Sequence, residues 1–376
     1  HSMIPLEWMP PLMFAGLVIF MLIGFPVAFS LMAAGLFFSI IAISEGFFGM
    51  AFLQAIPQRI FGSVLANDLL LAIPFFTFMG AILEKCGLAE DMLEGLGQLF
   101  GPIRGGLAYA VIIVGAILGA ITGTVAASVI AMGLISLPIM LRYGYDRRLA
   151  SGVIAASGTL AQIIPPSLVL IILADQLGRS VGEMYKGAFI PGFMLAGMYV
   201  GYVILIAIFK PTWVPALPME ARTIREDDGK SGLLSLLFLT IVSAGSAIAL
   251  GQNYGAVVSY FKGVAGVNPP TDETIVVSLC AGVLLAFVLA VLNKNLRLGL
   301  LSRMAERVTF VLIPPLFLIF LVLGTIFLGI ATPTEGGAMG ALGAIIMAVS
   351  RGRLSWLLLR QAMTSTTKLA SFVVFI

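Results

Sequence analysis

Two short stretches of small and hydroxylated residues could bind an ion inside an otherwise apolar chain. The first is Thr122-Gly123-Thr124, and the second is Ser157-Gly158-Thr159 followed by Pro165-Pro166-Ser167. Neither stretch carries an ionisable side chain, so its ligands would be hydroxyl and carbonyl oxygens, which suit a hard cation. Loosened backbone carbonyls at membrane depth are tolerated only when they are buried in protein or line a polar cavity. The pattern therefore predicts the ion and substrate site of a carrier.

The first stretch lies at the middle of an uncharged run, Leu107 to Leu141. As one helix this run would extend roughly 50 Å, well beyond a hydrocarbon core of about 30 Å. Two full spans would need about 40 residues and a turn, so the run predicts a re-entrant hairpin that reverses at Thr122–Thr124. Basic residues flank both ends, which places both ends in the cytoplasm. They are Arg104, Arg142, Arg147 and Arg148.

The second stretch interrupts another uncharged segment, Leu149 to Leu173. Pro165 and Pro166 supply no backbone donor, and each disfavours the α conformation in the residue before it. The segment therefore predicts a broken helix that opens near its centre, beside the hairpin turn.

The composition of the chain indicates the class of protein that contains these two stretches. The chain of 376 residues is 60% hydrophobic and 10% charged, with a mean hydropathy of +1.10. These values exclude an ordinary soluble domain and predict an all-α polytopic membrane protein. The single histidine is His1, in a His1-Ser2-Met3 start that resembles an expression-tag remnant. The spans hold no paired acids or histidine for an intramembrane enzyme, and the small net charge of +3 does not suggest nucleic acid.

Apolar runs and charge clusters divide the chain into four predicted segments. These are scaffold spans and a connector (1–106), the hairpin and broken helix (107–173), a return span with an additional pair of spans (174–307), and the start of a second repeat (308–376). The predicted spans outside the hairpin and broken helix are Pro10–Ile23, Val27–Ile43, Leu69–Leu83 with a kink at Pro74, Gly187–Phe209, Gly232–Leu250, Thr274–Leu292, Thr309–Ile330 and Gly336–Val349. The predicted connections are Ser44–Asn67, the outer loop Asp175–Lys186, the charged segment Lys210–Lys230 and the outer loop Gly251–Glu273.

Two elements leave alternatives open. Leu88 to Phe100 has apolar residues at helical spacing with acids between them, so it is either an amphipathic helix along the membrane interface or a solvated connector. Glu335 is either an ion-coupling group or a cap for the helix starting at Gly336, and the helix dipole favours the cap.

A faint internal repeat relates the two ends of the chain. Gly24–Gly35 resembles Ala331–Leu342, because each has a proline turn before a span of small residues. The positive-inside count places these turns on opposite sides of the membrane, as in inverted-topology repeats. The second copy lacks its own hairpin, so we expect the natural protein to continue beyond Ile376.

Three motifs carry a resemblance to a known family. They are GAITGTVAASVIAMG (Gly119 to Gly133), YDRRLASGVIAASGTLAQIIPPS (Tyr145 to Ser167) and GIATPTEGGAMGA (Gly329 to Ala341). With these motifs the chain resembles the large membrane subunit, the M or DctM-type permease, of tripartite ATP-independent periplasmic (TRAP) transporters. The resemblance implies an inverted-repeat, elevator-type secondary carrier in the bacterial inner membrane, driven by sodium and importing organic acids such as C4-dicarboxylates or sugar acids. It also implies a small four-helix membrane subunit and a periplasmic substrate-binding protein as partners, with sodium as coupling ion and no other cofactor.

The resemblance also implies site residues. The sodium ligands carried over are Thr122, Gly123, Thr124, Ser128, Gly158, Thr159, Ile164 and Pro165. The expected substrate-binding residues are Thr124, Val125, Ser128, Pro166 and Ser167, where the positive end of the second hairpin arm would face a carboxylate.

Two features depart from the family pattern. Val125 replaces the last serine of a Ser-Gly-Ser-Ser tip and removes one hydroxyl, and the spans between Gly232 and Leu292 are additional. Thr122 and Thr124 could instead be packing groups between helices. A stand-alone cation-coupled anion carrier of the same hairpin architecture is the alternative function.

Overall fold

The computed structural model describes residues 3–222, 233–297, 299 and 301–376. Throughout these ranges the regular structure is helical and contains no strand. The chain forms two compact units, His1–Leu70 with Thr367–Ile376 and Leu71–Thr366. This division does not test the four functional segments predicted with boundaries after residues 106, 173 and 307, so they stay a prediction.

In the first unit, α1 (Met9–Leu22) and α2 (Val27–Ser44) pack against each other around a turn at Gly24, whose φ of 100° favours glycine. The predicted connection Ser44–Asn67 is largely helical, with successive segments at Met50–Ala55, Ile56–Ile60 and Phe61–Leu65. Pro57 lies in the first turn of the middle segment, where its missing N–H leaves no hydrogen bond unmade. The connection is therefore more helical than its sequence predicts.

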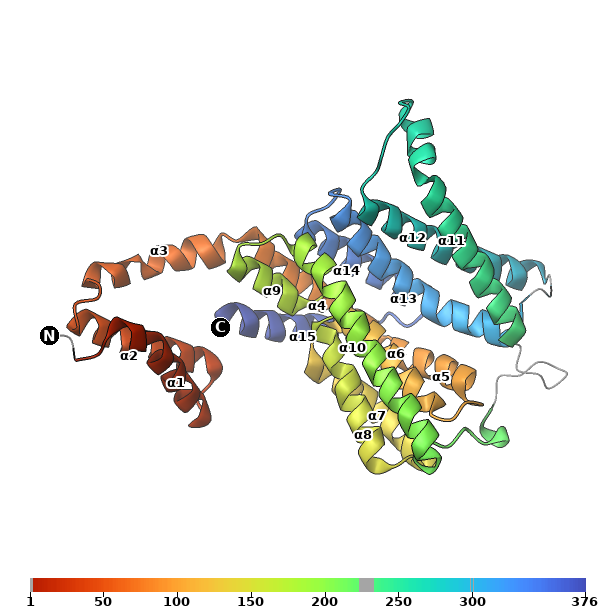
Figure 1. The fold of residues 1–376 in the computed structure, drawn as a ribbon, viewed down its shortest axis with the longest axis horizontal. Coiled ribbons are helices and arrows are strands. Elements are labelled where there is room, and N and C mark those ends of the chain that lie inside the picture. Colours follow the sequence, from red (N-terminus) through yellow and green to blue (C-terminus); the bar gives the residue numbers. More distant parts are fainter. Residues whose placement is uncertain (1–2, 223–232, 298, 300) are drawn as a thin grey trace. The chain divides into compact units, whose positions relative to one another are not determined.

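The second unit holds the hairpin and the broken helix, and Figure 1 shows its helices in order. The α-helices are α4 (Ala72–Lys85), α5 (Leu88–Phe100), α6 (Gly106–Thr122), α7 (Val125–Arg142), α8 (Arg147–Thr159), α9 (Leu168–Leu177), α10 (Val181–Phe209), α11 (Leu233–Lys262), α12 (Thr271–Leu296), α13 (Arg303–Phe327), α14 (Pro333–Ser350) and α15 (Trp356–Phe375), the last of which continues into the first unit.

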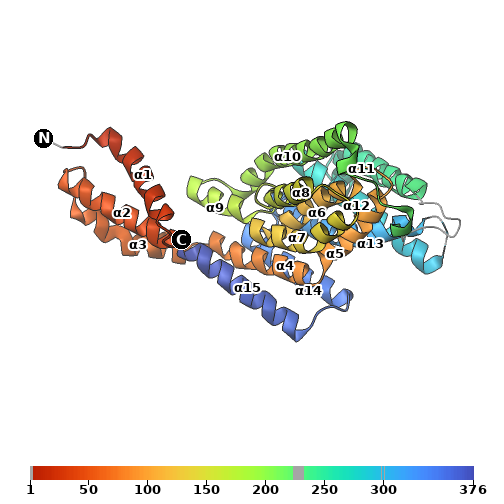
Figure 2. The same cartoon turned by 90° about the horizontal axis from the view of Figure 1, so that it is seen from below.

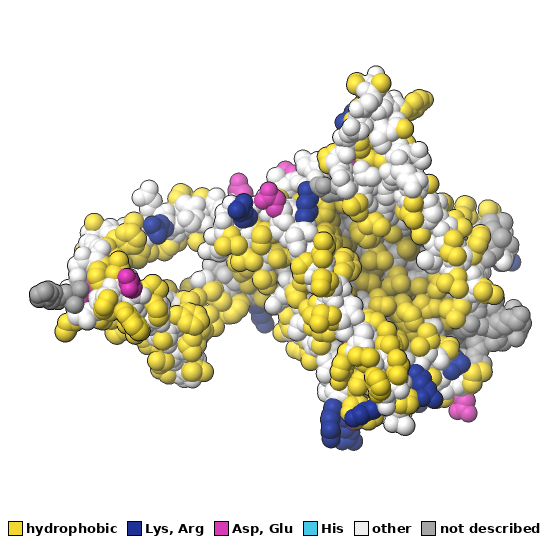
Figure 3. All heavy atoms as spheres, viewed as in Figure 1, with side chains coloured by type: hydrophobic (Ala, Val, Ile, Leu, Met, Phe, Trp, Pro, Cys, Tyr) yellow, Lys and Arg dark blue, Asp and Glu magenta, His cyan; other side chains and the backbone are white. Residues whose placement is uncertain are grey.

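Six described helices are long and apolar enough to cross a membrane, and a seventh candidate joins Met50–Leu65 to Asp68–Lys85. The six are α2, α7, α10, α11, α12 and α13. Hydrophobic side chains cover much of the face seen in Figure 3, and the Lys and Arg side chains on it lie in a few small groups. The all-α polytopic membrane fold expected from composition is confirmed.

Helix boundaries differ from the predictions where polar residues follow an apolar run. Only residues 178–180 separate α9 from α10, in place of the outer loop predicted at Asp175–Lys186. Helix α11 likewise continues to Lys262, well into the loop predicted at Gly251–Glu273. Both predictions ended a helix where hydrophobicity ended, but backbone hydrogen bonding continues through polar residues outside the apolar layer. The charged residues 223–230 lie outside the described residues.

Proline and capping residues mark the starts of two other helices. Pro74 lies in the first turn of α4, which follows a short 3-10 turn at Asp68–Leu71, so its missing N–H costs little helical hydrogen bonding. The predicted kink at Pro74 stays a prediction. At the start of α14, the Glu335 carboxylate accepts a hydrogen bond from the Thr332 backbone N–H at 3.0 Å, and the Thr332 hydroxyl accepts one from the Glu335 N–H at 3.2 Å. This capping box confirms that Glu335 caps the start of a helix, which begins at Pro333.

Helix α5 has the predicted bounds and lies against α6 and α13. Its apolar face is buried, with Leu88 and Met92 fully covered and Leu96 nearly so. This packing excludes the solvated connector. Its acidic residues, Glu90, Asp91 and Glu94, lie between the apolar positions and stay at least partly exposed, so they are accessible to basic side chains.

Candidate functional site

The hairpin is built as two helices joined by a two-residue tip. Helix α6 ends at Thr122, Gly123 adopts a φ of 66°, and Thr124 is extended before α7 begins. A Cβ on Gly123 would also lie only 2.9 Å from Cγ of Leu168, the first residue of α9. Glycine is therefore required by both its backbone conformation and the close approach. The tip thus touches the second half of the broken helix.

At the opposite end of the hairpin, the Tyr145 hydroxyl accepts a hydrogen bond from the Leu107 backbone N–H at 3.1 Å. Burial raises the pKa of Tyr145 to about 12. At this end a neutral hydrogen bond therefore connects the start of α6 to the loop after α7.

The predicted broken helix is interrupted where its prolines fall. Helix α8 ends at Thr159, a short 3-10 turn covers Leu160–Gln162, and α9 begins only at Leu168. Because Pro165 has no N–H, the Ala161 carbonyl cannot receive its usual helical hydrogen bond. The Gln162 carbonyl accepts instead from the Ser167 hydroxyl at 2.9 Å. The break therefore redirects backbone oxygens away from helical pairing.

Glycines on α6 let this helix lie directly on the backbone of the break. A Cβ on Gly115 would be 2.7 Å from Cβ of Ser157, and one on Gly119 would be 2.6 Å from Cα of Ala161. Figure 2 shows α6, α7 and α8 side by side, in agreement with their contacts. The structure thus brings the two predicted stretches together.

Three hydroxyls of the hairpin lie near its tip. Thr122 and Ser128 are buried, and their oxygens share a hydrogen bond of 2.7 Å. The Thr122 hydroxyl also lies 3.5 Å from the Thr124 carbonyl. The half-buried Thr124 side chain makes no hydrogen bond within the described chain. Its oxygen is therefore available to an ion or substrate.

The remaining predicted residues lie in or next to the break. Thr159 donates to the Ala156 carbonyl at 2.6 Å. The other predicted residues there are buried: Gly158, Ile164, Pro165, Pro166 and Ser167. Val125 is the half-buried first residue of α7, so the position that lacks a serine hydroxyl lies at the tip.

Sequence reasoning missed two tyrosines of α10. The Tyr199 hydroxyl lies 3.2 Å from that of Thr159. Tyr185 is fully buried, and its hydroxyl lies next to the Ser167 backbone without a well-formed hydrogen bond to any described residue. Helix α10 approaches the break at Gly192, where a Cβ would lie 3.1 Å from Ile164. The available signal was a phenol inside an apolar span, because such a hydroxyl requires a polar partner.

The donor set suits a hard monovalent cation. In the described residues, no three His, Cys, Asp or Glu side chains lie close enough to hold a metal ion. The site offers instead hydroxyls and redirected carbonyls, and each hydroxyl oxygen has two lone pairs for ligation. A helical hairpin against a broken helix, among apolar spans, is the architecture of a membrane transport protein.

The chain belongs to the DctM component family of the tripartite ATP-independent periplasmic transporters, whose family description matches residues 14–376. The resemblance inferred from the three motifs is confirmed. The family consists of transporter subunits and not of enzymes.

Named relatives fall in the same class. The chain is similar to the C4-dicarboxylate TRAP transporter large permease protein DctM of Vibrio cholerae, with 30% identity over 56% of this chain and 44% of the relative. It is 36% identical to a putative TRAP transporter large permease protein of Haemophilus influenzae, over 37% of this chain and 35% of the relative. The sialic acid TRAP transporter large permease protein SiaM of Vibrio cholerae is 28% identical over 59% of this chain and 50% of its own length. The matches thus cover half or less of these relatives.

Proposed function

We propose that this chain is the large permease subunit of a TRAP transporter that imports an organic acid together with sodium across the bacterial inner membrane. The observation that carries the proposal is the uncharged, oxygen-rich contact between the hairpin tip and the break in the helix. Relatives named for C4-dicarboxylate and sialic acid support an organic acid as substrate.

In this proposal, sodium is the coupling ion and is bound by oxygens of both stretches. Thr124 is the most informative ligand because its hydroxyl is not committed to another protein group. Its neighbour Val125 begins α7, whose N-terminal N–H groups and positive helix dipole favour a carboxylate at the same place. Ion and substrate would then stabilise each other, since each lowers the electrostatic cost of binding the other.

The proposed partners follow from the family. A periplasmic binding protein delivers the acid, a small four-helix membrane subunit braces the scaffold, and the hairpin and broken helix move together as part of an elevator. A stand-alone carrier is the alternative, and transport by the permease subunit without its partners would favour it.

The test is uptake of a radiolabelled acid by proteoliposomes that contain the full-length permease and both partners. We expect Thr124→Val with Thr159→Val to abolish sodium stimulation. The matched control is Thr240→Val with Thr364→Val, which removes two exposed hydroxyls that bond only to their own helices. Uptake that is indifferent to sodium, or equal loss in both double variants, would contradict the proposed cage.

A further inference from the structure

A cavity of about 390 Å³ lies where α5, α12, α13 and the loop after α14 meet. Four basic side chains and one carboxylate line it, and none of them belongs to the hairpin site. They are Lys294, Arg307, Arg351, Arg353 and Asp91.

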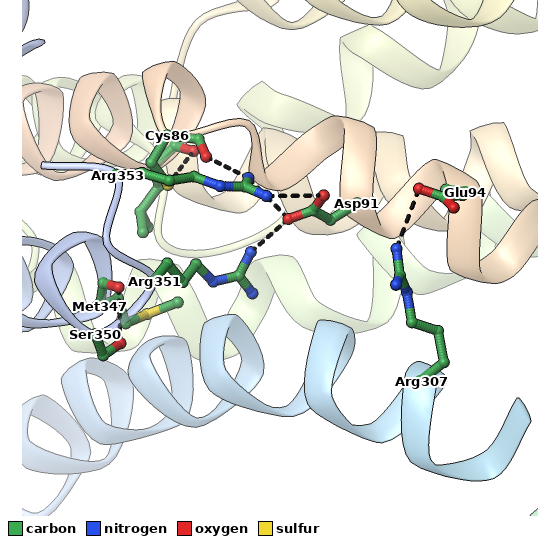
Figure 4. Close-up of polar contacts among 9 residues, drawn as sticks. Cys86, Asp91, Glu94, Arg307, Met347, Ser350, Arg351 and Arg353 are labelled. Carbon is green, nitrogen blue, oxygen red and sulfur yellow. Dashed lines mark hydrogen bonds and ion pairs between the residues drawn. The ribbon is translucent and has the colours of Figure 1, made fainter. Parts of the chain in front are cut away.

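Among the described residues that line the cavity, one carboxylate, Asp91, meets four cations. Glu90, Glu94 and Glu306 lie close by but outside the lining. Asp91 forms ion pairs with Arg351 at 2.8 Å and with Arg353 at 2.9 Å, and Glu94 pairs with Arg307 at 3.1 Å (Figure 4). Two carboxylates thus form ion pairs with three guanidinium groups. Glu90 adds negative charge near Arg353 but forms no ion pair within the described chain.

Lys294 increases this imbalance. Its ammonium lies 5.1 Å from the centroid of the Phe310 ring, which also lines the cavity. It makes no ion pair with any described residue. Arg351 is only 17% exposed, and one of its N–H groups bonds to Asp91. A guanidinium has five N–H donors in a planar fork that matches phosphate oxygens, so donors remain for an anion.

The cavity lies at the ends of membrane helices. Lys294 is in the last turn of α12, Arg307 is near the start of α13, and Arg351 directly follows α14. Basic residues gather at this end, which the positive-inside rule assigns to the cytoplasm. Phe310 and Val311 give the cavity an apolar wall that continues into α13. Charge above an apolar wall matches the headgroup and upper chain of a phospholipid.

We propose that this cavity binds the phosphate of an anionic phospholipid headgroup. The phosphate would supply the missing negative charge and connect α12 and α13 with the arginines beside α5. A soluble phosphate would satisfy the cations but would leave the apolar wall uncovered. The proposal does not depend on sodium coupling or on the transported acid.

The test measures lipid retention by the purified full-length protein with native mass spectrometry. The probes are dioleoyl phosphatidylglycerol, the neutral dioleoyl phosphatidylcholine and glycerol phosphate. We expect preferential retention of phosphatidylglycerol. Equal retention of the two lipids would overturn the proposal, and so would binding of glycerol phosphate as tight as that of phosphatidylglycerol.

A matched pair of variants locates the binding. Lys294→Gln removes a cation that has no ion pair to lose, and we expect about fivefold weaker phosphatidylglycerol binding, since one basic residue near an anionic lipid contributes about 1 kcal/mol. Arg297→Gln removes the same charge three residues later, outside the cavity lining, and we expect no change. Equal effects of the two variants would show general surface charge and overturn the proposal.

A third variant separates binding from folding. Glu94→Gln removes a carboxylate and releases Arg307 toward the cavity, so we expect tighter phosphatidylglycerol binding. If the cluster served only to hold helices together, this variant would weaken stability without strengthening lipid binding, and that result would overturn the proposal.

Discussion

The hairpin site and the charged cluster around Asp91 join helices by different means. At the site, glycines of α6 let this helix pack directly against the backbone of the break. The polar groups of the site are hydroxyls and carbonyls. At the cluster, carboxylates of α5 meet arginines that follow α14 or begin α13. The first region depends on shape, and the second depends on charge.

This difference follows from where each region can keep its groups solvated. A charge deep in a membrane costs free energy and requires a partner, whereas neutral oxygens can stay without a bound ion at lower cost. Charges at helix ends keep contact with water, as the 42% exposure of Arg307 illustrates. The proposed ion site is therefore better built from neutral oxygens than from charged groups.

The largest effect is expected at the glycine contact. Gly119→Ala would place a methyl group 2.6 Å from the backbone of Ala161, which cannot rotate away as a side chain could. We expect about 3 kcal/mol of destabilisation, measured by detergent unfolding of the purified protein. Gly152→Ala on α8 is the control, because its new Cβ meets nothing within 4 Å and alanine favours a helix. Equal stability of the two variants would show that shape does not hold the site.

The next effect is expected at the hydroxyl pair of the tip. Thr122→Val leaves the buried Ser128 hydroxyl without its 2.7 Å partner and should cost about 1.5 kcal/mol. Adding Ser128→Ala should cost less than the sum of the two single changes, because the second change removes the orphaned group. Unfolding of all four proteins in the cycle measures this coupling. Strict additivity would show that the pair does not interact.

A smaller and salt-sensitive effect is expected at the cluster. Asp91→Asn removes the negative partner of Arg351 and Arg353, and we expect a loss of about 1 kcal/mol. The loss should shrink in 1 M salt because partly exposed charges are screened. The loss caused by Gly119→Ala should not change with salt, so unfolding at two ionic strengths separates the two regions. Equal salt sensitivity would contradict the comparison.

The smallest effect is expected at the pair between Glu94 and Arg307. Their side chains are 55% and 42% exposed, so Glu94→Gln should change stability by no more than about 0.5 kcal/mol. The same unfolding measurement applies. A loss as large as that of Asp91→Asn would mean that this pair is part of one cooperative network.

Local chemistry made much of the site predictable. Pro165 and Pro166 located the break, the Thr122–Thr124 turn located the tip, and the apolar spacing of Leu88–Phe100 gave α5 its observed bounds. Each prediction depended on residues close together in the chain. Which of these oxygens bind sodium or substrate stays a prediction.

Contacts between distant segments were not predictable in the same way. Nothing near Asp91 indicates Arg351, and nothing near Thr159 indicates Tyr199, because one sequence does not say which helix faces meet. Helix ends such as that of α11 were missed for another reason. Hydropathy locates the apolar layer, whereas the helix ends where backbone hydrogen bonding stops.

The ion pair between Asp91 and Arg351 joins residues 260 positions apart. The two partners are therefore synthesised at different times. At about 5–20 residues per second, Arg351 is made more than about ten seconds after Asp91. Before Arg307 and Arg351 are made, α5 can be held by its apolar face and by the hydrogen bond from Gln98 to the Ala221 carbonyl, and the hairpin can assemble before the arginines arrive. During synthesis, the hairpin and the broken helix can thus form first, and the ion pairs between Asp91 and the arginines that follow α14 form afterwards.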